Sequence, residues 1–336
     1  MSKVTTTTDT RIANHPRVSV GLAVYNGEHF IAEAIESILH QTYSDFELII
    51  CDNCSSDSTP AIIERYAAQD SRIRYYQNEK NIGWWRNFNR VFELSTGEYF
   101  MWATDDDKRE PTFIERTIEV LDNNDWAILC YAQTKLIDSV GNEIPREAQR
   151  RGYYVDQAGN VLRMRDAERW DKHLDSPDPV ERFRGIVLLT GFCHEQFALI
   201  RREVLAKTSL MAGYFGSDKA VLTQLCLLGR FASIPEPLFM NRRHPEQSSN
   251  IVSAKDRALW TDASQKVWST VRLRLRVTEG AIDAVMKSNL TLAQRLACFW
   301  IIFRYFLDAG KWLTVFEEMT HRKRRKLLGQ TMGKSV

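Results

Sequence analysis

The sequence lacks any apolar run long enough to cross a lipid bilayer. Its most apolar stretch, Leu296–Phe303, has 8 residues before Arg304, far below the roughly 20 that a membrane-spanning helix needs. The first 15 residues are polar and contain no apolar core of signal-peptide length, which predicts a loose N-terminal arm (1–15). These absences argue against an integral membrane protein, and we expect the protein to stay in the cytosol.

Common phosphate-binding motifs are missing as well. Neither G-x-G-x-x-G nor G-x-x-x-x-G-K-[ST] occurs, which disfavours a Rossmann dinucleotide site and a P-loop. The 6 cysteines are scattered, and the single C-x-x-C, Cys51 and Cys54, has no second pair at zinc spacing. Phosphate groups would therefore have to be bound through a metal ion.

The net charge of +2 hides an uneven distribution. Residues 251–336 carry 16 Lys+Arg against 7 Asp+Glu, a balance of +9, and residues 1–250 carry 29 against 36, a balance of −7. The acidic larger part argues against a nucleic-acid partner. A chain of 336 residues, 44% hydrophobic and 26% charged, is long enough for one large α/β domain plus a smaller appended part.

Short apolar runs rich in β-branched residues alternate with amphipathic segments over the first hundred residues. The predicted strands are Val18–Val24, Phe46–Asp52, Ile73–Gln77 and Glu98–Trp102. Three helices are predicted between them. The first has Ile31, Ile35, Ile38 and Leu39 on one face, and the second begins at Thr59 as its N-cap. The third covers Trp84–Leu94. This alternation predicts an α/β fold with a mostly parallel sheet and helices on both faces.

Polar side chains follow three of these strands: Tyr25 and Asn26, Asp52 and Asn53, and Asp105–Asp107. Ligands of open α/β sheets bind beyond the carboxyl ends of the strands. Three adjacent acids are either a solvated acidic turn or a site for a hard cation such as Mn²⁺ or Mg²⁺. Their place at a strand end favours the metal site.

Three segments of the chain together resemble the nucleotide-binding half of the family 2 glycosyltransferases. They are Arg17–Thr59, NIGWWRN (Asn81–Asn87) and TGEYFMWATDDD (Thr96–Asp107). The resemblance covers residues 17–135 closely and continues more loosely to about residue 250. It implies the A-type glycosyltransferase fold with a nucleotide-binding sheet, an inverting mechanism, Mn²⁺ or Mg²⁺ as cofactor, and a nucleotide-sugar donor, for which we expect a UDP-sugar.

The resemblance also assigns residues to the donor. Those expected at the nucleotide are Tyr25, Asn26, Asp52, Asn53, Arg86, Asn87, Asp105 and Arg242. Asn53 departs from the family, since many members have a second aspartate there, and this leaves the preferred base open. Trp84 and Trp85 are unusual beside Arg86 and either pack the helix on the sheet or stack on a sugar.

The expected metal ligands are Asp106, Asp107 and His244, with the register among the three acids open by one residue. Arg242 and His244 resemble the family's R-x-H element, although a lone histidine is often only a structural hydrogen-bonder.

The acceptor side is expected in the less regular middle of the chain. Asp218 opens a helix in a segment that resembles the family's later part, so it is either a first-turn charge or cap, or the catalytic base. His194 and Glu195 are further candidates facing the acceptor. Residues 141–179 have no clear period and are expected to form an acceptor-facing excursion.

We therefore expect a flexible arm (1–15), a catalytic domain (16–250) with a nucleotide-sugar half (16–135) and an acceptor half (136–250), and a basic, Trp-rich helical region (251–336). The last region holds Trp260, Trp268, Trp300 and Trp312 and the cationic run Arg322–Lys326. Aromatic and basic residues together predict contact with an anionic membrane surface, with Leu296–Phe303 forming either a core helix or an interfacial one.

The predicted function is transfer of a sugar to a hydroxyl of a lipid-linked or polymeric glycan at the inner face of the cell membrane, where the protein would be peripheral. Two alternatives stay open at this point. A sugar-nucleotide synthesising nucleotidyltransferase also uses carboxylates and a divalent cation on an α/β sheet. A non-catalytic glycan-binding module would keep the aromatic residues without the acids.

Overall fold

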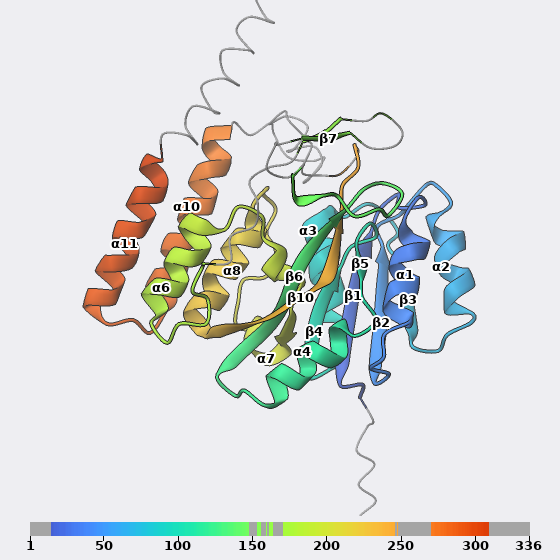
Figure 1. Ribbon diagram of the computed structural model, residues 1–336, viewed down its shortest axis with the longest axis horizontal. Helices are drawn as coiled ribbons and strands as arrows, with labels where there is room; N and C mark the ends of the chain where they lie inside the picture. Colours follow the sequence, from blue (N-terminus) through green and yellow to red (C-terminus); the bar gives the residue numbers. More distant parts are fainter. Residues whose placement is uncertain are drawn as a thin grey trace, which may run out of the picture.

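The computed structural model describes residues 15–147, 153–155, 159, 161–163, 171–245, 247 and 270–308. Its centre is an eight-stranded sheet with the strand order β3-β2-β1-β4-β9-β6-β10-β5 (Figure 1). The first half of the chain forms β1 (Val18–Val24), α1 (Ile31–Leu39), β2 (Phe46–Asp52), α2 (Thr59–Ala67), β3 (Ile73–Gln77), α3 (Trp84–Glu93), β4 (Tyr99–Ala103), β5 (Lys108–Arg109), α4 (Phe113–Asp122) and β6 (Ala127–Ile137). The second half forms β7 (Tyr153–Val155), β8 (Val161–Arg163), α6 (Pro179–Arg184), β9 (Leu199–Arg201), α7 (Arg202–Leu205), α8 (Ser217–Leu228), β10 (Arg230–Arg242), α10 (Thr270–Lys287) and α11 (Leu292–Leu307).

The predicted strands of the first half are confirmed. β1, β2 and β3 have the expected bounds, and β4 is shifted by one residue. All seven residues of β1 and all seven of β2 are buried, because an inner strand of a parallel sheet is covered on both faces. The near-continuous apolar sequence of each strand is what such double coverage requires.

Strand directions agree with the predicted, mostly parallel sheet. β1 pairs in parallel with β2 and β4, β2 with β3, and β6 with β10. β9 lies between β4 and β6 and runs antiparallel to both, and β5 runs antiparallel to β10. The ends of β1, β2 and β4 therefore meet at one edge of the sheet.

Helices cover both faces of the sheet. α3 packs on β1 and β2, whereas α1 and α2 pack on the other face (Figure 1). A Cβ atom at Gly21 of β1 would lie 2.7 Å from Cγ2 of Val91, so the glycine lets α3 approach closely. The predicted cap of α2 is wrong by one residue: Ser58 is at the N-cap position. The Thr59 hydroxyl instead accepts the backbone N–H of Gly27 at 2.8 Å.

A group of helices lies at the opposite end of the molecule from α1 and α2 (Figure 1). α10 packs on α8, and α11 packs on α10 and α6. α11 begins with a capping box in which Thr291 and Gln294 exchange hydrogen bonds, which fixes its first turn. The predicted boundary at residue 250 and the Arg322–Lys326 run lie outside the described residues. None of the described helices combines the length and the apolarity that crossing a membrane requires.

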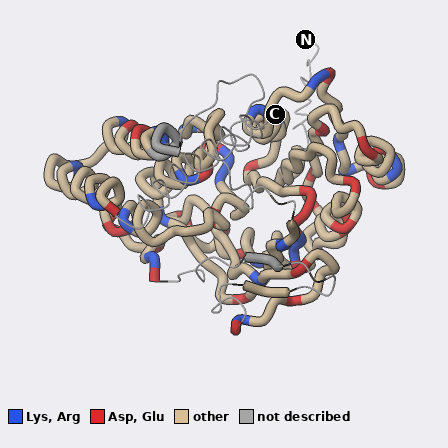
Figure 2. The backbone as a smooth tube through the Cα atoms, turned by 90° about the horizontal axis from the view of Figure 1, so that it is seen from above, with Lys and Arg blue, Asp and Glu red and all other residues tan. Residues whose placement is uncertain are grey.

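Charged residues of both signs are spread over the described chain (Figure 2). Residues 270–308 contain 6 Lys+Arg and 3 Asp+Glu, so they contribute only part of the positive balance predicted for the C-terminal region. The rest of that balance falls on residues outside the described part.

Candidate active site

The loops after β1, β2 and β4 meet at the sheet edge where the sequence predicts the donor. Tyr25 is half-exposed there, and Asn26 has φ 52°, a left-handed conformation that asparagine tolerates. A Cβ atom at Gly27 would lie 2.4 Å from Oδ2 of Asp105. Glycine at this position therefore allows the loop after β1 to pass directly over the Asp105 carboxylate.

Asp105 and Asp106 are half-buried, and the structure brings Asp106 together with His244. Nε2 of His244 is 3.2 Å from Oδ2 of Asp106, and the ring centroid of His244 is 4.9 Å from that of Phe30. Burial, followed by the neighbouring charge of Asp106, raises the pKa of Asp105 well above its usual range. Holding so much negative charge in one turn is costly unless a cation binds beside it.

The Asp106–His244 pair suits a divalent cation in its chemistry. It offers a carboxylate oxygen and an imidazole nitrogen, donors that Mn²⁺ accepts, and Mg²⁺ accepts the carboxylate. No group of three or more His, Cys, Asp or Glu placed to hold a metal ion occurs in the described part of the chain. A cation at Asp106 would thus take its remaining ligands from water or from a bound diphosphate.

Asp107 has a different environment from its two neighbours. Its carboxylate is buried and accepts hydrogen bonds from Asn241 Nδ2 at 2.9 Å, from the backbone N–H of Arg242 at 2.9 Å, and from Thr104 Oγ1 at 2.8 Å. Burial, together with the charge of Asp106, raises its pKa to about 6. With both oxygens engaged, Asp107 joins the acidic turn to the end of β10.

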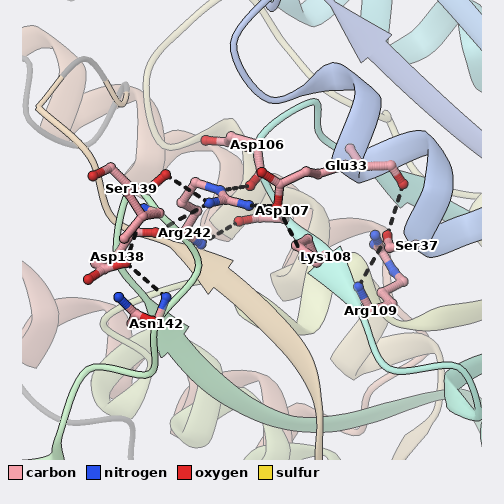
Figure 3. Close-up of polar contacts among 12 residues, drawn as sticks. Glu33, Ser37, Asp106, Asp107, Lys108, Arg109, Asp138, Ser139, Asn142 and Arg242 are labelled. Atoms are coloured by element: carbon pink, nitrogen blue, oxygen red, sulfur yellow. Dashed lines mark hydrogen bonds and ion pairs between the residues drawn. The ribbon is translucent and has the colours of Figure 1, made fainter.

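Arg242 is also occupied by the protein itself. Its guanidinium donates to the carbonyl oxygens of Asp106, Asp138 and Ser139 and to the Glu33 carboxylate at 2.8 to 3.3 Å (Figure 3). Its side chain is completely buried. The sequence placed Arg242 among the residues expected at the nucleotide, whereas in the structure every guanidinium nitrogen already donates within the fold. Arg242 holds α1, β10 and the acidic turn together and so positions the Asp106–His244 pair.

Asp52, the last residue of β2, lies at the same edge of the sheet and is held by hydrogen bonds. It is fully buried, and its Oδ1 accepts the backbone N–H and the hydroxyl of Ser55 at 2.9 and 2.5 Å. Its Oδ2 lies 3.3 Å from the Tyr75 hydroxyl and 3.2 Å from Gln77 Nε2. Burial and the charge of Asp52 raise the pKa of Tyr75, which keeps the phenol as a donor. Asp52 thereby orders the loop after β2.

A chain of hydrogen-bonded amides, in which Asn53, Asn78 and Asn87 are buried and Asn81 is exposed, explains why residue 53 is asparagine. Asn53 donates from Nδ2 to Oδ1 of Asn81 at 2.9 Å, and its Oδ1 accepts from Asn78 Nδ2 at 3.0 Å and from the backbone N–H of Ile82 at 2.9 Å. Oδ1 of Asn81 also accepts the backbone N–H of Gly83 at 2.8 Å, so it must act as an acceptor. An ionised aspartate at position 53 has no proton to donate to it.

Asn87 belongs to the same amide chain. Its Oδ1 accepts from Asn78 at 2.9 Å, and its Nδ2 donates to the backbone carbonyl of Cys51 at 2.7 Å. Asn87 is buried, whereas Arg86 is exposed and its guanidinium lies 4.3 Å from the Trp85 ring centroid. Trp84 and Trp85 pack half-buried against the core, which agrees with the packing alternative.

Asp218 is the second residue of α8, and Gly216, with φ 92°, is the N-cap. Asp218 is therefore a first-turn acid and not the cap. It is half-buried, and its Oδ1 accepts the backbone N–H of Lys219 at 2.8 Å. Burial raises the pKa of Asp218, against the opposing effects of the Lys219 N–H and of the Cys193 thiol. A carboxylate with a raised pKa is a stronger base than an exposed one.

Residues 192–195 lie between the Asp106–His244 pair and Asp218. The guanidinium of Arg243 lies 4.6 Å from the Phe192 ring centroid, and the adjacent Cys193 contacts Asp218. His194 stacks on Phe192 with ring centroids 5.5 Å apart. Glu195 is fully buried and forms an ion pair with Lys172, so its carboxylate is turned into the fold rather than toward an acceptor.

Sequence reasoning missed several residues that build this site. Gly27, Asn78 and Asn81 carry no charge, and Lys172 lies 23 positions before Glu195, the acid with which it pairs. A signal for the amide chain was present, since Asn78 and Asn81 lie in the short loop between the strand that ends at Gln77 and the helix that begins at Trp84. The partner that each amide selects depends on tertiary packing.

Comparison with known proteins identifies the class of enzyme. The model of the family described as Glycosyl transferase family 2 matches residues 19–208, which is more than half of the chain. An uncharacterised glycosyltransferase of Haemophilus influenzae is 26% identical over 243 residues, 71% of this chain and 69% of that protein. The putative glycosyltransferase EpsE of Bacillus subtilis is 39% identical over 110 residues, which are 32% of this chain and 40% of that protein.

Solved structures have the same fold. Residues 1–349 of TarS from S. aureus, in complex with UDP-GlcNAc, match with a TM-score of 0.60 and 15% identity over 86% of this chain and 72% of that one. The mannosyltransferase PcManGT from Pyrobaculum calidifontis, in complex with GDP-Man and Mn²⁺, matches with a TM-score of 0.53 and 14% identity over 95% of this chain and 80% of that one.

The fold is the A-type glycosyltransferase fold with a helical C-terminal part, as predicted. The chain belongs to glycosyl transferase family 2 and is a glycosyltransferase. This membership argues against both alternatives left open by the sequence, the nucleotidyltransferase and the non-catalytic module.

Proposed function

We propose that the protein is an inverting, metal-dependent glycosyltransferase that moves a sugar from a UDP-sugar to a hydroxyl of a lipid-linked or polymeric glycan. The observation that carries the proposal is the half-buried Asp106–His244 pair beside Asp105 at the sheet edge. Structural neighbours in complex with UDP-GlcNAc, or with GDP-Man and Mn²⁺, support a nucleotide-sugar donor at this edge.

Asp106 and His244 would hold Mn²⁺ or Mg²⁺, and Asp105 would bind the donor ribose. When bound, the cation neutralises charge on the leaving diphosphate. Asp107 and Arg242 hold the acidic turn in place, because the Asp107 carboxylate and the Arg242 guanidinium form hydrogen bonds within the fold. Tyr25 and Asn26 border the nucleotide, and Asp52 and the amide chain hold the loops that surround it.

Asp218 is the proposed general base. A sugar hydroxyl is a weak nucleophile at neutral pH, so a carboxylate that accepts its proton contributes roughly 10² to 10⁴ in rate. The acceptor oxygen forms a bond to the anomeric carbon as the bond from that carbon to the diphosphate oxygen breaks. A single displacement of this kind inverts the anomeric centre, and the proton moves to Asp218.

A panel of sugar nucleotides tests the proposal. The purified protein is incubated with each donor and candidate glycan acceptors, with Mn²⁺ or with a chelator, and released nucleoside diphosphate is measured. We expect release from one donor, dependent on Mn²⁺ and increased by an acceptor. Pyrophosphate release would point to a nucleotidyltransferase, and equal turnover with the chelator would refute metal dependence.

We further propose that the enzyme acts as a peripheral protein at the inner face of the cell membrane. The five cations Arg322–Lys326 support this placement, since each Lys or Arg near an anionic surface contributes about 1 kcal/mol at low salt. Changing all five to Gln should weaken binding to anionic liposomes in a salt-dependent way. Equal sedimentation with neutral and anionic liposomes would contradict this placement.

A further inference from the structure

α11 is apolar on two opposite faces. Its inner face, with Cys298, Ile301 and Ile302, is buried against the rest of the protein. Its outer face carries five apolar side chains that are between 48% and 74% exposed. We call these the outer stripe: Leu292, Leu296, Trp300, Phe303 and Leu307.

The outer stripe is a continuous line along the helix. Successive members are four, four, three and four residues apart, so they fall on one side of a helix with 3.6 residues per turn. The rings of Trp300 and Phe303 touch, with centroids 5.6 Å apart. A helix on the surface of a soluble protein normally has one apolar face, and a second one is typical of a helix that is covered by a partner.

The neighbouring helix α10 shows the ordinary pattern. It also exposes apolar side chains, namely Leu275, Ile282 and Met286. On α10, however, two ion pairs accompany them, Arg276 with Glu279 at 3.1 Å and Lys287 with Asp283 at 2.8 Å. A surface of mixed charge suits water, so the uninterrupted stripe is a property of α11 and not of the whole helical region.

Charge indicates what covers the outer stripe. Arg304 is exposed beside the stripe, and the chain that continues after Asp308 has 7 Lys+Arg and only 2 Asp+Glu in residues 309–336. An apolar face with a cation beside it, in a chain that continues into a basic sequence, is typical of helices that lie in the interface of an anionic bilayer. Five partly exposed side chains amount to a few hundred Å², below the roughly 800 Å² that each subunit contributes to a stable dimer.

We propose that the outer stripe of α11 docks on an anionic lipid bilayer. The helix lies in the plane of the interface, with Trp300 and Phe303 among the headgroups and upper acyl chains. Its 16 residues are too few to span the bilayer. This docking does not depend on the proposed sugar transfer, and it adds a salt-resistant apolar contact to the salt-sensitive one proposed for Arg322–Lys326.

The test compares two matched triple variants of the full-length protein. The first carries Leu296→Gln, Trp300→Gln and Phe303→Gln on α11. The control carries Leu275→Gln, Ile282→Gln and Met286→Gln on α10, which removes a similar set of exposed apolar side chains. Co-flotation with phosphatidylcholine vesicles, with and without phosphatidylglycerol, gives the bound fraction. Circular dichroism and thermal unfolding verify the fold, and light scattering without lipid gives the oligomeric state.

We expect the α11 variant to bind anionic vesicles at least about ten-fold more weakly than the wild type, including at high salt, and the α10 control to bind normally. Trp300→Phe should retain binding but reduce the quenching of tryptophan fluorescence by brominated lipid, to which the remaining eight tryptophans can still contribute. Normal binding by the α11 variant would overturn the proposal. So would a wild-type dimer that the α11 variant converts to a monomer, since a second copy would then cover the stripe.

Discussion

Replacement of Asn53 by aspartate tests whether the amide chain sets the identity of residue 53. The ionised side chain would place a carboxylate oxygen where Nδ2 now donates to Asn81 at 2.9 Å, in a position that is 2% exposed. An unsatisfied buried acceptor costs about 1–3 kcal/mol and a buried charge adds to it, so we expect Asn53→Asp to lose roughly 2–4 kcal/mol at pH 8. That loss corresponds to a fall in Tm of about 4–8 °C for a large domain.

The loss should depend on pH in a definite direction. When the introduced carboxyl group is protonated, its O–H can replace the missing donor, so its pKa in the folded variant is raised above that of the unfolded chain. Stability is then fully retained below the unfolded pKa of about 3.9 and is lost as pH rises through the folded pKa. Chemical unfolding from pH 4 to pH 8 measures this, with Asn289→Asp, at an exposed loop position, as the control.

A compensating change at residue 81 completes the experiment. Asn81→Ser introduces a hydroxyl that can accept from Gly83 and donate to the carboxylate introduced at position 53, so the double variant should regain part of the stability lost in Asn53→Asp. Either of two results would refute the role of the amide chain. One is a double variant that is no more stable than the sum of the two single changes predicts. The other is an Asn53→Asp protein that is as stable as the wild type at pH 8.

Three further predictions concern the carboxylates. Asp218→Asn should lower kcat by roughly 10² to 10⁴. The variant should unfold at neutral pH no earlier than the wild type, because the raised pKa of Asp218 means that its ionised form destabilises the fold above that pKa. Wild-type kcat should fall as pH drops through the raised pKa, since the base is then protonated, and a flat pH profile would contradict the assignment. Asp107→Asn should leave Mn²⁺ affinity within a few-fold, as titration calorimetry would show, because both oxygens of Asp107 already bind the protein. Gly27→Ala should weaken donor binding with little change in Tm, since its Cβ would meet the Asp105 carboxylate at 2.4 Å; unchanged donor affinity would exclude Asp105 from the donor site.

The sequence predicted the nucleotide half of the fold closely because its strands are long, apolar and punctuated by turn residues. β1 and β2 have the predicted bounds, since only double burial favours runs such as Val18–Val24 and Phe46–Asp52. β9 could not be placed in the sheet in this way. It has only three residues, and its position between β4 and β6 is determined by tertiary packing.

The site residues show the same division. Residue types predicted that Asp105, Asp106 and Asp107 gather at a strand end, but not that Asp107 turns inward to Asn241 while Asp106 faces His244. Arg242 was assigned to the nucleotide because Arg242 and His244 resemble the family's R-x-H element. The burial of Arg242 beside Glu33 could be seen only in the folded chain. A sequence supplies donors and acceptors, and packing decides which of them pair.

The central claim is that Asp106 holds a divalent cation through which the donor diphosphate binds. Titration calorimetry of UDP binding, with Mn²⁺ and with a chelator, tests it on the wild type, Asp106→Asn and Asp107→Asn. We expect Mn²⁺ to tighten UDP binding by roughly ten-fold or more in the wild type and in Asp107→Asn, and to have no effect in Asp106→Asn. An equal effect of Mn²⁺ on UDP binding in Asp106→Asn and the wild type would contradict the claim.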